Sequence, residues 1–235
     1  MSMSKGKMVS FTRPDGQQLQ GYLVTPEEEI KGPAVIVIQE WWGLNNQIRR
    51  VADRLASAGY VALVPDLYRG KSTVEAEEAH HLMSGLNFAD AAEQDIAGAV
   101  DFLRDKATKV AVMGYCIGGA LTIMSMAKNP VIAAGVAWYG FPPLESLSVI
   151  ESTAPLLGHW AIQDEFFPLE GVEKLEERLR DSSVPYTFYQ YLALHAFANE
   201  EATGDGRLTS THYDAVWAQV AWDRSLTFLG KHLWG

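Results

Sequence analysis

The chain is short of positive charge and nearly free of cysteine. Its 235 residues include 19 lysines and arginines against 29 aspartates and glutamates, a formal net charge of −10 at pH 7. Nucleic acids and anionic membrane surfaces are bound by clustered Lys and Arg, so we expect neither as a partner. One cysteine can form no internal disulfide, and the same count excludes a cysteine-cluster metal site.

Long apolar runs are missing as well. No window approaches the roughly 18 uncharged apolar residues that suggest a membrane span, and residues 1–16 lack the apolar core of a signal peptide. No repeat, low-complexity tract or linker divides the chain. We therefore expect a cytoplasmic protein with one domain over residues 1–235, as a monomer or a small homo-oligomer.

Short apolar runs alternate with stretches of helical spacing. Strands are predicted at 8–12, 19–24, 33–40, 60–68, 109–116, 131–140, 155–164 and 185–192. Helices are predicted at 45–59, 73–104 (one or two), 121–128, 170–181 and 213–233. This alternation predicts an α/β fold with a mostly parallel, twisted sheet and helices on both faces.

The segment GYCIGG (114–119) matches the pattern Gly-x-nucleophile-x-Gly, with cysteine as the nucleophile. A nucleophile on a sharp turn between a strand and a helix has a strained backbone, and its neighbours two residues away crowd unless they are glycine. The turn would also place the Cys116 sulfur near a helix N-terminus, where the dipole favours a thiolate. The alternative is a glycine-rich packing turn around a buried cysteine.

A nucleophilic thiol needs a base and a carboxylate that orients the base. His195 and Asp164 follow predicted strands and stand in the order nucleophile, acid, histidine. Glu165 is the alternative acid. We interpret His159 as a structural or pocket-lining residue. Of the other histidines, we assign His80 and His81 to the surface, and His212 and His232 to a loop and the C-terminal tail.

Glu40 ends the strand 33–40 beside Trp41 and Trp42. A carboxylate there would face the thiol, where it would either repel a thiolate or hold the S–H group by a hydrogen bond. The alternative is a solvated glutamate at a strand end, but the two tryptophans favour a pocket wall.

Several motifs together resemble the dienelactone hydrolases (carboxymethylenebutenolidases). They are QEWWG (39–43), PDLY (65–68), GYCIGG (114–119), QD (163–164) and HAF (195–197), and the similarity extends from about residue 8 to 230. The resemblance implies an α/β-hydrolase fold. It also implies hydrolysis of cyclic enol-lactones in the catabolism of chlorinated aromatic compounds, without metal or cofactor.

The resemblance further implies the role of each site residue. Cys116, His195 and Asp164 would form the catalytic triad, and Glu40 would hold the resting thiol until substrate displaces it. Backbone amides of Trp41 and Ile117 would form the oxyanion hole.

The sequence departs from the family where substrate would bind. Asn199 occupies the position at which an arginine for the substrate carboxylate commonly follows the histidine motif. Arg69, Lys71 and Arg207 are the candidate replacements. Substrate contacts are predicted for Arg69, Tyr115, Trp42 and Phe197, and the further candidate lining residues are Trp138, Tyr139, Trp160 and Phe166.

About 14 residues, 141–154, separate two predicted strands, too few for a large cap domain. We therefore expect an open pocket and a small lactone or ester as substrate. An esterase or thioesterase acting on an unrelated small ester is the second interpretation. A ligand-binding protein in which Glu40 permanently neutralises Cys116 is the third.

Overall fold

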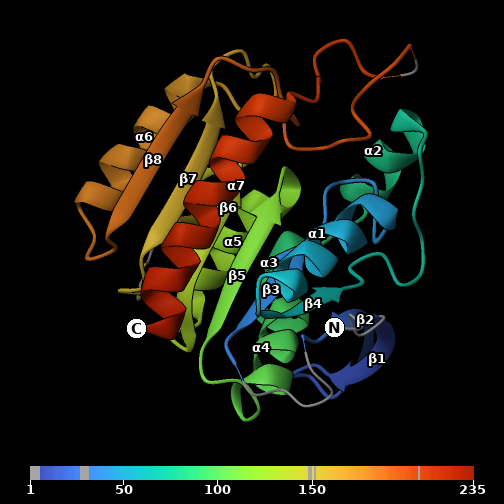
Figure 1. Ribbon diagram of the computed structural model, residues 1–235, viewed down its shortest axis with the longest axis vertical. Helices are drawn as coiled ribbons and strands as arrows, with labels where there is room; N and C mark the ends of the chain where they lie inside the picture. The colour runs from blue at the N-terminus through green and yellow to red at the C-terminus, as the bar shows by residue number, and fades with distance from the viewer. Residues whose placement is uncertain (1–5, 27–31, 148–149, 151, 206) are drawn as a thin grey trace.

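A continuous eight-stranded sheet forms the centre of the protein (Figure 1). The computed structural model describes residues 6–26, 32–147, 150, 152–205 and 207–235. The strands are β1 (Lys7–Thr12), β2 (Gln18–Val24), β3 (Ala34–Ile38), β4 (Val61–Pro65), β5 (Val110–Tyr115), β6 (Ile132–Trp138), β7 (Leu156–Ala161) and β8 (Tyr186–Tyr191). Their order is β1-β2-β4-β3-β5-β6-β7-β8. Pairings of β1 with β2 and of β2 with β4 are antiparallel and the other five are parallel, which confirms the predicted mostly parallel sheet.

Helices cover both faces of the sheet. In Figure 1, α1 and α7 lie in front of the strands, and α5 and α6 lie behind them. The helices are α1 (Asn46–Ser57), α2 (Ala76–Ser84), α3 (Phe88–Asp90), α4 (Ala97–Arg104), α5 (Ile117–Lys128), α6 (Leu169–Arg180) and α7 (Ala215–Leu229). Two π-helical turns, η1 (Ala91–Ile96) and η3 (Gly230–Trp234), and a 3₁₀ turn, η2 (Leu144–Leu147), complete the described elements.

The sequence placed most helices correctly but not all of their ends. Asn45 caps α1, because its side chain accepts a hydrogen bond from the Ile48 amide, as predicted. The predicted start of a helix at 121 is wrong, since α5 begins at Ile117, directly after the cysteine. The glycines that follow the cysteine hid these first helical residues, because glycine normally counts against a helix.

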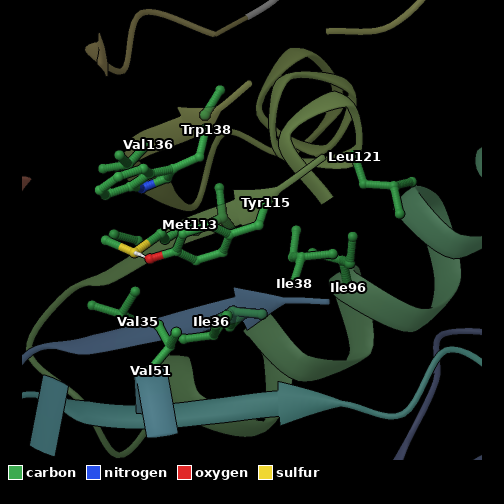
Figure 2. Packing of buried hydrophobic residues seen from close by; sticks show 14 of the residues in the cluster. Val35, Ile36, Ile38, Val51, Ile96, Met113, Tyr115, Leu121, Val136 and Trp138 are labelled. Atoms are coloured by element: carbon green, nitrogen blue, oxygen red, sulfur yellow. Dashed lines mark hydrogen bonds between the residues drawn. The ribbon is translucent and has the colours of Figure 1, made fainter. Parts of the chain in front are cut away.

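The central strands are buried on both faces, which explains their continuous apolar runs. Every residue of β3, β4, β5 and β7 is buried. Figure 2 shows Tyr115 and Trp138 stacked on one side of the sheet, with Ile38, Ile96 and Leu121 packed on the other; the two stacked ring centroids are 5.1 Å apart. The core therefore fixes β3, β5 and β6, whose carboxyl ends carry loops at one edge of the sheet.

Candidate active site

Cys116 occupies a strained turn between β5 and α5. Its φ is +55°, a left-handed conformation that residues with a Cβ rarely adopt. A Cβ on Gly118 would lie 2.5 Å from the Ile38 carbonyl oxygen, and a Cβ on Gly114 would collide with the Gly118 backbone. Both glycines are therefore required by close backbone packing. The turn presents the Cys116 side chain to a cavity above the strand ends.

Two loops at the same edge bring an acid and a histidine together. Asp164 follows β7 and His195 follows β8, and the His195 Nδ1 and Asp164 Oδ2 atoms lie 2.7 Å apart. The other carboxylate oxygen, Asp164 Oδ1, accepts hydrogen bonds from the amides of Phe166 and Phe167, both at 2.9 Å. Since each oxygen of Asp164 has its own donor, the carboxylate is fixed in one orientation.

The environment of His195 favours the charged imidazolium. Burial alone would lower its pKa, but the sulfur of Cys116 and the hydrogen bond to Asp164 oppose burial and raise the pKa to about 10. The side chain is thus electrostatically coupled to Cys116 on one side and hydrogen-bonded to Asp164 on the other. A positive imidazolium beside a sulfur is the charge arrangement that favours a nucleophilic thiolate.

Glu40 is buried near this group, but its hydrogen bonds run to other partners than expected. Its Oε1 accepts a hydrogen bond from the Tyr139 hydroxyl at 2.9 Å, and its Oε2 accepts one from Asn199 Nδ2 at 2.5 Å. Burial raises the pKa of Glu40, while His195 and these two donors oppose that rise. Among the hydrogen bonds of the described residues, none joins Glu40 to Cys116, so the predicted contact with the thiol is absent from this structure.

A cavity of about 730 Å³ opens above the cysteine. Its floor includes Glu40, Trp41, Cys116, Ile117 and His195. The walls come from residues 73–83, which include most of α2, and from residues 199–203 and 207–211 of the long loop before α7. Figure 1 shows α2 and this loop at the same end of the molecule. As expected, residues 139–155, between β6 and β7, contain only a short 3₁₀ turn among those described.

Of the four predicted substrate contacts, only Trp42 lines this cavity. Tyr115 is stacked under Trp138 in the core, and Phe197 is fully buried against Trp138, Tyr139 and Tyr191. Arg69 is paired with Asp95, with both guanidinium–carboxylate contacts at 2.9 Å. These three expectations are therefore corrected: each side chain is engaged elsewhere.

Among the candidate cations, Arg207 lines the cavity and Lys71 does not. The Arg207 guanidinium is also bound to its own loop, because Nη1 donates to the carbonyl oxygens of Leu208, Thr209 and Thr211. Arg207 thus braces the loop and also contributes to the lining of the cavity.

The remaining candidate residues differ in whether they line the cavity. Glu165 accepts a hydrogen bond from the Ser210 hydroxyl at 2.6 Å, so its carboxylate is engaged by the long loop. His159 is fully buried in β7, as a structural residue would be. His80 is exposed, as predicted, yet it also lines the cavity. Of the candidate aromatic lining residues, Phe166 contributes to the cavity, whereas Trp138, Tyr139 and Trp160 are buried in the core.

Sequence reasoning missed most of the cavity walls. Val74, Met83 and Leu208 face the cavity, but they come from segments whose pattern indicated only a helix or a polar loop. Tyr139 was considered only as a lining residue, and its bond to Glu40 was not foreseen. The one available signal was Asn199, noted because an arginine was expected there.

Within the described residues, no helix combines the length and the apolar sequence that a membrane span requires. In the same part of the chain, no group of three or more His, Cys, Asp or Glu side chains is arranged to hold a metal ion.

Comparison with known proteins assigns the chain to a family. The profile of the dienelactone hydrolase family matches residues 19–233. The chain belongs to the dienelactone hydrolase family. It is an ester or lactone hydrolase of that family, with the α/β-hydrolase type of fold.

Relatives match over nearly their whole length. "Protein usf" of Aquifex pyrophilus is 33% identical, covering 97% of this chain and 99% of that protein. "Putative carboxymethylenebutenolidase" of Aquifex aeolicus is 29% identical with the same coverage. Among solved structures, "Putative Dienelactone Hydrolase" from Klebsiella pneumoniae superposes with a TM-score of 0.79 at 25% identity, covering 97% of this chain and 99% of that one.

Proposed function

We propose that this hydrolase cleaves a small lactone or ester with Cys116, His195 and Asp164 as a catalytic triad. The sulfur attacks the substrate carbonyl, and the tetrahedral intermediate collapses to a thioester as the alkoxide leaves and takes a proton from His195. The neutral His195 then removes a proton from water, which attacks the thioester and regenerates the sulfur. Asp164 orients His195 and stabilises its positive form.

One observation carries the proposal: a buried histidine is hydrogen-bonded to a fixed carboxylate and electrostatically coupled to a cysteine on a strained turn. A merely structural cysteine needs no left-handed φ and no cavity in front of it. No metal or cofactor takes part in these steps.

The oxyanion would be held by two backbone amides. Ile117 is the first residue of α5, and the first N–H groups of a helix have no acceptor within the helix. Trp41 follows β3 and lines the same cavity. The amides of Ile117 and Trp41 would each stabilise the transition state by about 3–4 kcal/mol, as oxyanion donors typically do.

The substrate is a small molecule reached through the open side of the cavity. Trp42 would supply an aromatic wall, and Arg207, which also lines the cavity, would meet a substrate carboxylate. A dienelactone, as in the catabolism of chlorinated aromatic compounds, would use both. We place the reaction in the cytoplasm, without nucleic acid or membrane as partner and with the protein as a monomer or small homo-oligomer.

A second candidate is an esterase or thioesterase for an uncharged small ester. It is favoured by Asn199 and Arg69, whose side chains are bound to Glu40 and Asp95 rather than directed at a ligand. A panel that compares dienelactone with neutral lactones and esters of similar size separates the two. If a free carboxylate on the substrate brings no gain in kcat/KM, the uncharged ester is the better assignment.

The triad itself is tested by Cys116→Ala. We expect the turnover of a small aryl ester to fall by about 10⁴-fold or more, and one equivalent of iodoacetamide to inactivate the unchanged protein. Full turnover by Cys116→Ala would show that the nucleophile is assigned wrongly. Loss of turnover would also exclude the interpretation as a non-catalytic ligand-binding protein, because that protein has no turnover to lose.

A further inference from the structure

The Glu40 side chain lies near the proposed nucleophile, but its hydrogen bonds are made to Tyr139 and Asn199. It lines the same cavity as Cys116, its side chain is buried, and both of its carboxylate oxygens already have a donor. The donors come from two separate parts of the chain, Tyr139 after β6 and Asn199 in the long loop. Each donor satisfies one of the two carboxylate oxygens, so two separate parts of the chain together fix the position of one carboxyl group.

Both donors are themselves held firmly. Tyr139 is fully buried with a φ of +38°, and its ring meets the His195 ring edge-on with centroids 5.1 Å apart. Asn199 is buried too, and its side-chain oxygen accepts a hydrogen bond from the Glu201 amide at 2.9 Å. Since Asn199 uses its oxygen on the loop, its amide nitrogen is oriented to donate to Glu40.

We propose that Asn199 and Tyr139 are positioning residues that hold the Glu40 carboxyl away from the Cys116 sulfur, which is therefore ready to react before substrate binds. The inference rests on the proposed function, since it assumes that Cys116 is the nucleophile. It differs from the expectation that Glu40 holds the resting thiol, and it assigns roles to two residues outside the triad.

The charges around the sulfur show why the position of Glu40 matters. His195 faces both groups, and Tyr68 and Tyr139 interact electrostatically with the sulfur. A carboxylate released toward the sulfur would repel a thiolate, and a protonated carboxyl would hydrogen-bond the sulfur and reduce its nucleophilicity. Glu201 also faces Glu40, and its like charge disfavours the ionised form. In either protonation state a released Glu40 slows attack by the sulfur.

Alkylation by iodoacetamide tests this directly, because Cys116 is the one cysteine in the chain. Rates are measured between about pH 5 and 9, a range that covers the usual titration of a reactive cysteine thiol, for Asn199→Ala, Tyr139→Phe and the double variant Asn199→Ala/Glu40→Gln. We expect Asn199→Ala to slow alkylation at neutral pH by roughly tenfold, which corresponds to about 1.4 kcal/mol. We expect a smaller slowing in Tyr139→Phe and recovery to within about twofold in the double variant.

The control is Asn129→Ala, which removes an asparagine that bonds the Val131 amide between α5 and β6. It should alkylate like the unchanged protein. If Asn199→Ala keeps the unchanged rate and pH profile, or if the double variant is as slow as the single, the positioning role is wrong. Tyr139→Phe decides the matter by the same criterion should Asn199→Ala fail to fold.

Turnover by Cys116→Ala reports separately on the proposed function. If that variant hydrolyses ester at the full rate, the nucleophile is wrong, whereas an unchanged alkylation profile in Asn199→Ala with an inactive Cys116→Ala overturns only the positioning role.

Discussion

Two buried histidines of this protein have pKa values that are shifted in opposite directions. His159 in β7 and His195 after β8 are both almost inaccessible to water. The pKa of His159 is lowered to about 3, first by burial and then by the positive charge of Arg224. The pKa of His195 is raised to about 10, although burial acts on it in the same direction as on His159. Burial therefore does not decide the charge of a histidine here, and the partners do.

The partners of His159 fix it as the neutral ring. Ser225 donates its hydroxyl proton to the Ala221 carbonyl oxygen, so the 2.9 Å contact with His159 Nε2 requires Nε2 to be the donor. Arg224 donates to the Tyr191 hydroxyl, which in turn donates to His159 Nδ1 at 2.8 Å. The chain of hydrogen bonds leaves no acceptor for a second ring proton. His195, by contrast, has a carboxylate on one side and a sulfur on the other.

The largest expected effect is the difference in kcat between variants of the two histidines. His195→Gln removes the proposed base, and we expect kcat to fall by about 10³–10⁴-fold. His159→Leu should change kcat by less than tenfold as long as the protein is folded, because His159 does not line the cavity. Steady-state hydrolysis of a small aryl ester by both variants provides the comparison. Equal losses in the two variants would mean that His195 has no special role.

The next largest effect is expected from Asp164, the carboxylate that is hydrogen-bonded to His195. Asp164→Asn keeps the shape of the side chain but removes the negative charge that helps raise the pKa of His195. We expect that pKa to fall toward the ordinary value and kcat to fall by about 10³-fold. An NMR titration of the His195 ring, read beside the kinetics, checks both. A ring that still titrates near pH 10 would show that Asp164 is not a cause of the shift.

These two histidines also show what the sequence could and could not predict. Order along the chain and position after a strand were enough to select His195, and the glycines around Cys116 were enough to locate the strained turn. His159 could be assigned only as structural or pocket-lining, because Tyr191 and Ser225 are distant in sequence. The hydrogen bonds of Asn199 and Tyr139 to Glu40 could not be predicted for the same reason, since these residues too are distant in sequence. Short-range rules of backbone geometry are readable from the sequence, whereas pairings across the fold leave no local pattern.

The same limit explains the wrong substrate contacts. Tyr115 directly precedes Cys116 and ends β5, and successive side chains in a strand point to opposite faces. Phe197 lies two residues after His195, and its ring packs against Trp138 and Tyr191. Both side chains therefore enter the core, while Val74 and Leu208 reach the cavity from remote segments.

A smaller effect is expected on stability at the structural histidine. His159→Leu leaves the hydroxyls of Tyr191 and Ser225 without their ring partner in a buried site. Ser225 keeps its bond to the Ala221 carbonyl oxygen, so the Tyr191 hydroxyl proton is the donor that loses its acceptor. An unpaired buried polar group costs about 1–3 kcal/mol, and we expect the free energy of unfolding to fall by about that amount. Urea denaturation at neutral pH measures it. An unchanged unfolding midpoint would show that the hydrogen-bond chain does not stabilise the fold.

A further effect on stability is a pH dependence carried by His159. Its pKa is about 3 in the folded protein and near the ordinary value when unfolded, so between these pH values only the unfolded chain binds the proton. Stability therefore falls as the pH drops below about 6.5, by up to ~1.4 kcal/mol per pH unit from this group. Urea denaturation at pH 6, 5 and 4 should show a steeper fall for the unchanged protein than for His159→Leu. Parallel curves would contradict a neutral buried His159.

The central claim is that Cys116 carries the acyl group during hydrolysis. Intact-mass spectrometry of the protein quenched in acid during turnover of an aryl ester tests it most directly, with His195→Gln used to slow the second half-reaction. The account predicts one added acyl group, located on Cys116 by peptide mapping and absent in Cys116→Ala. Continued turnover with no acyl group on Cys116 at any time, in either protein, would contradict it.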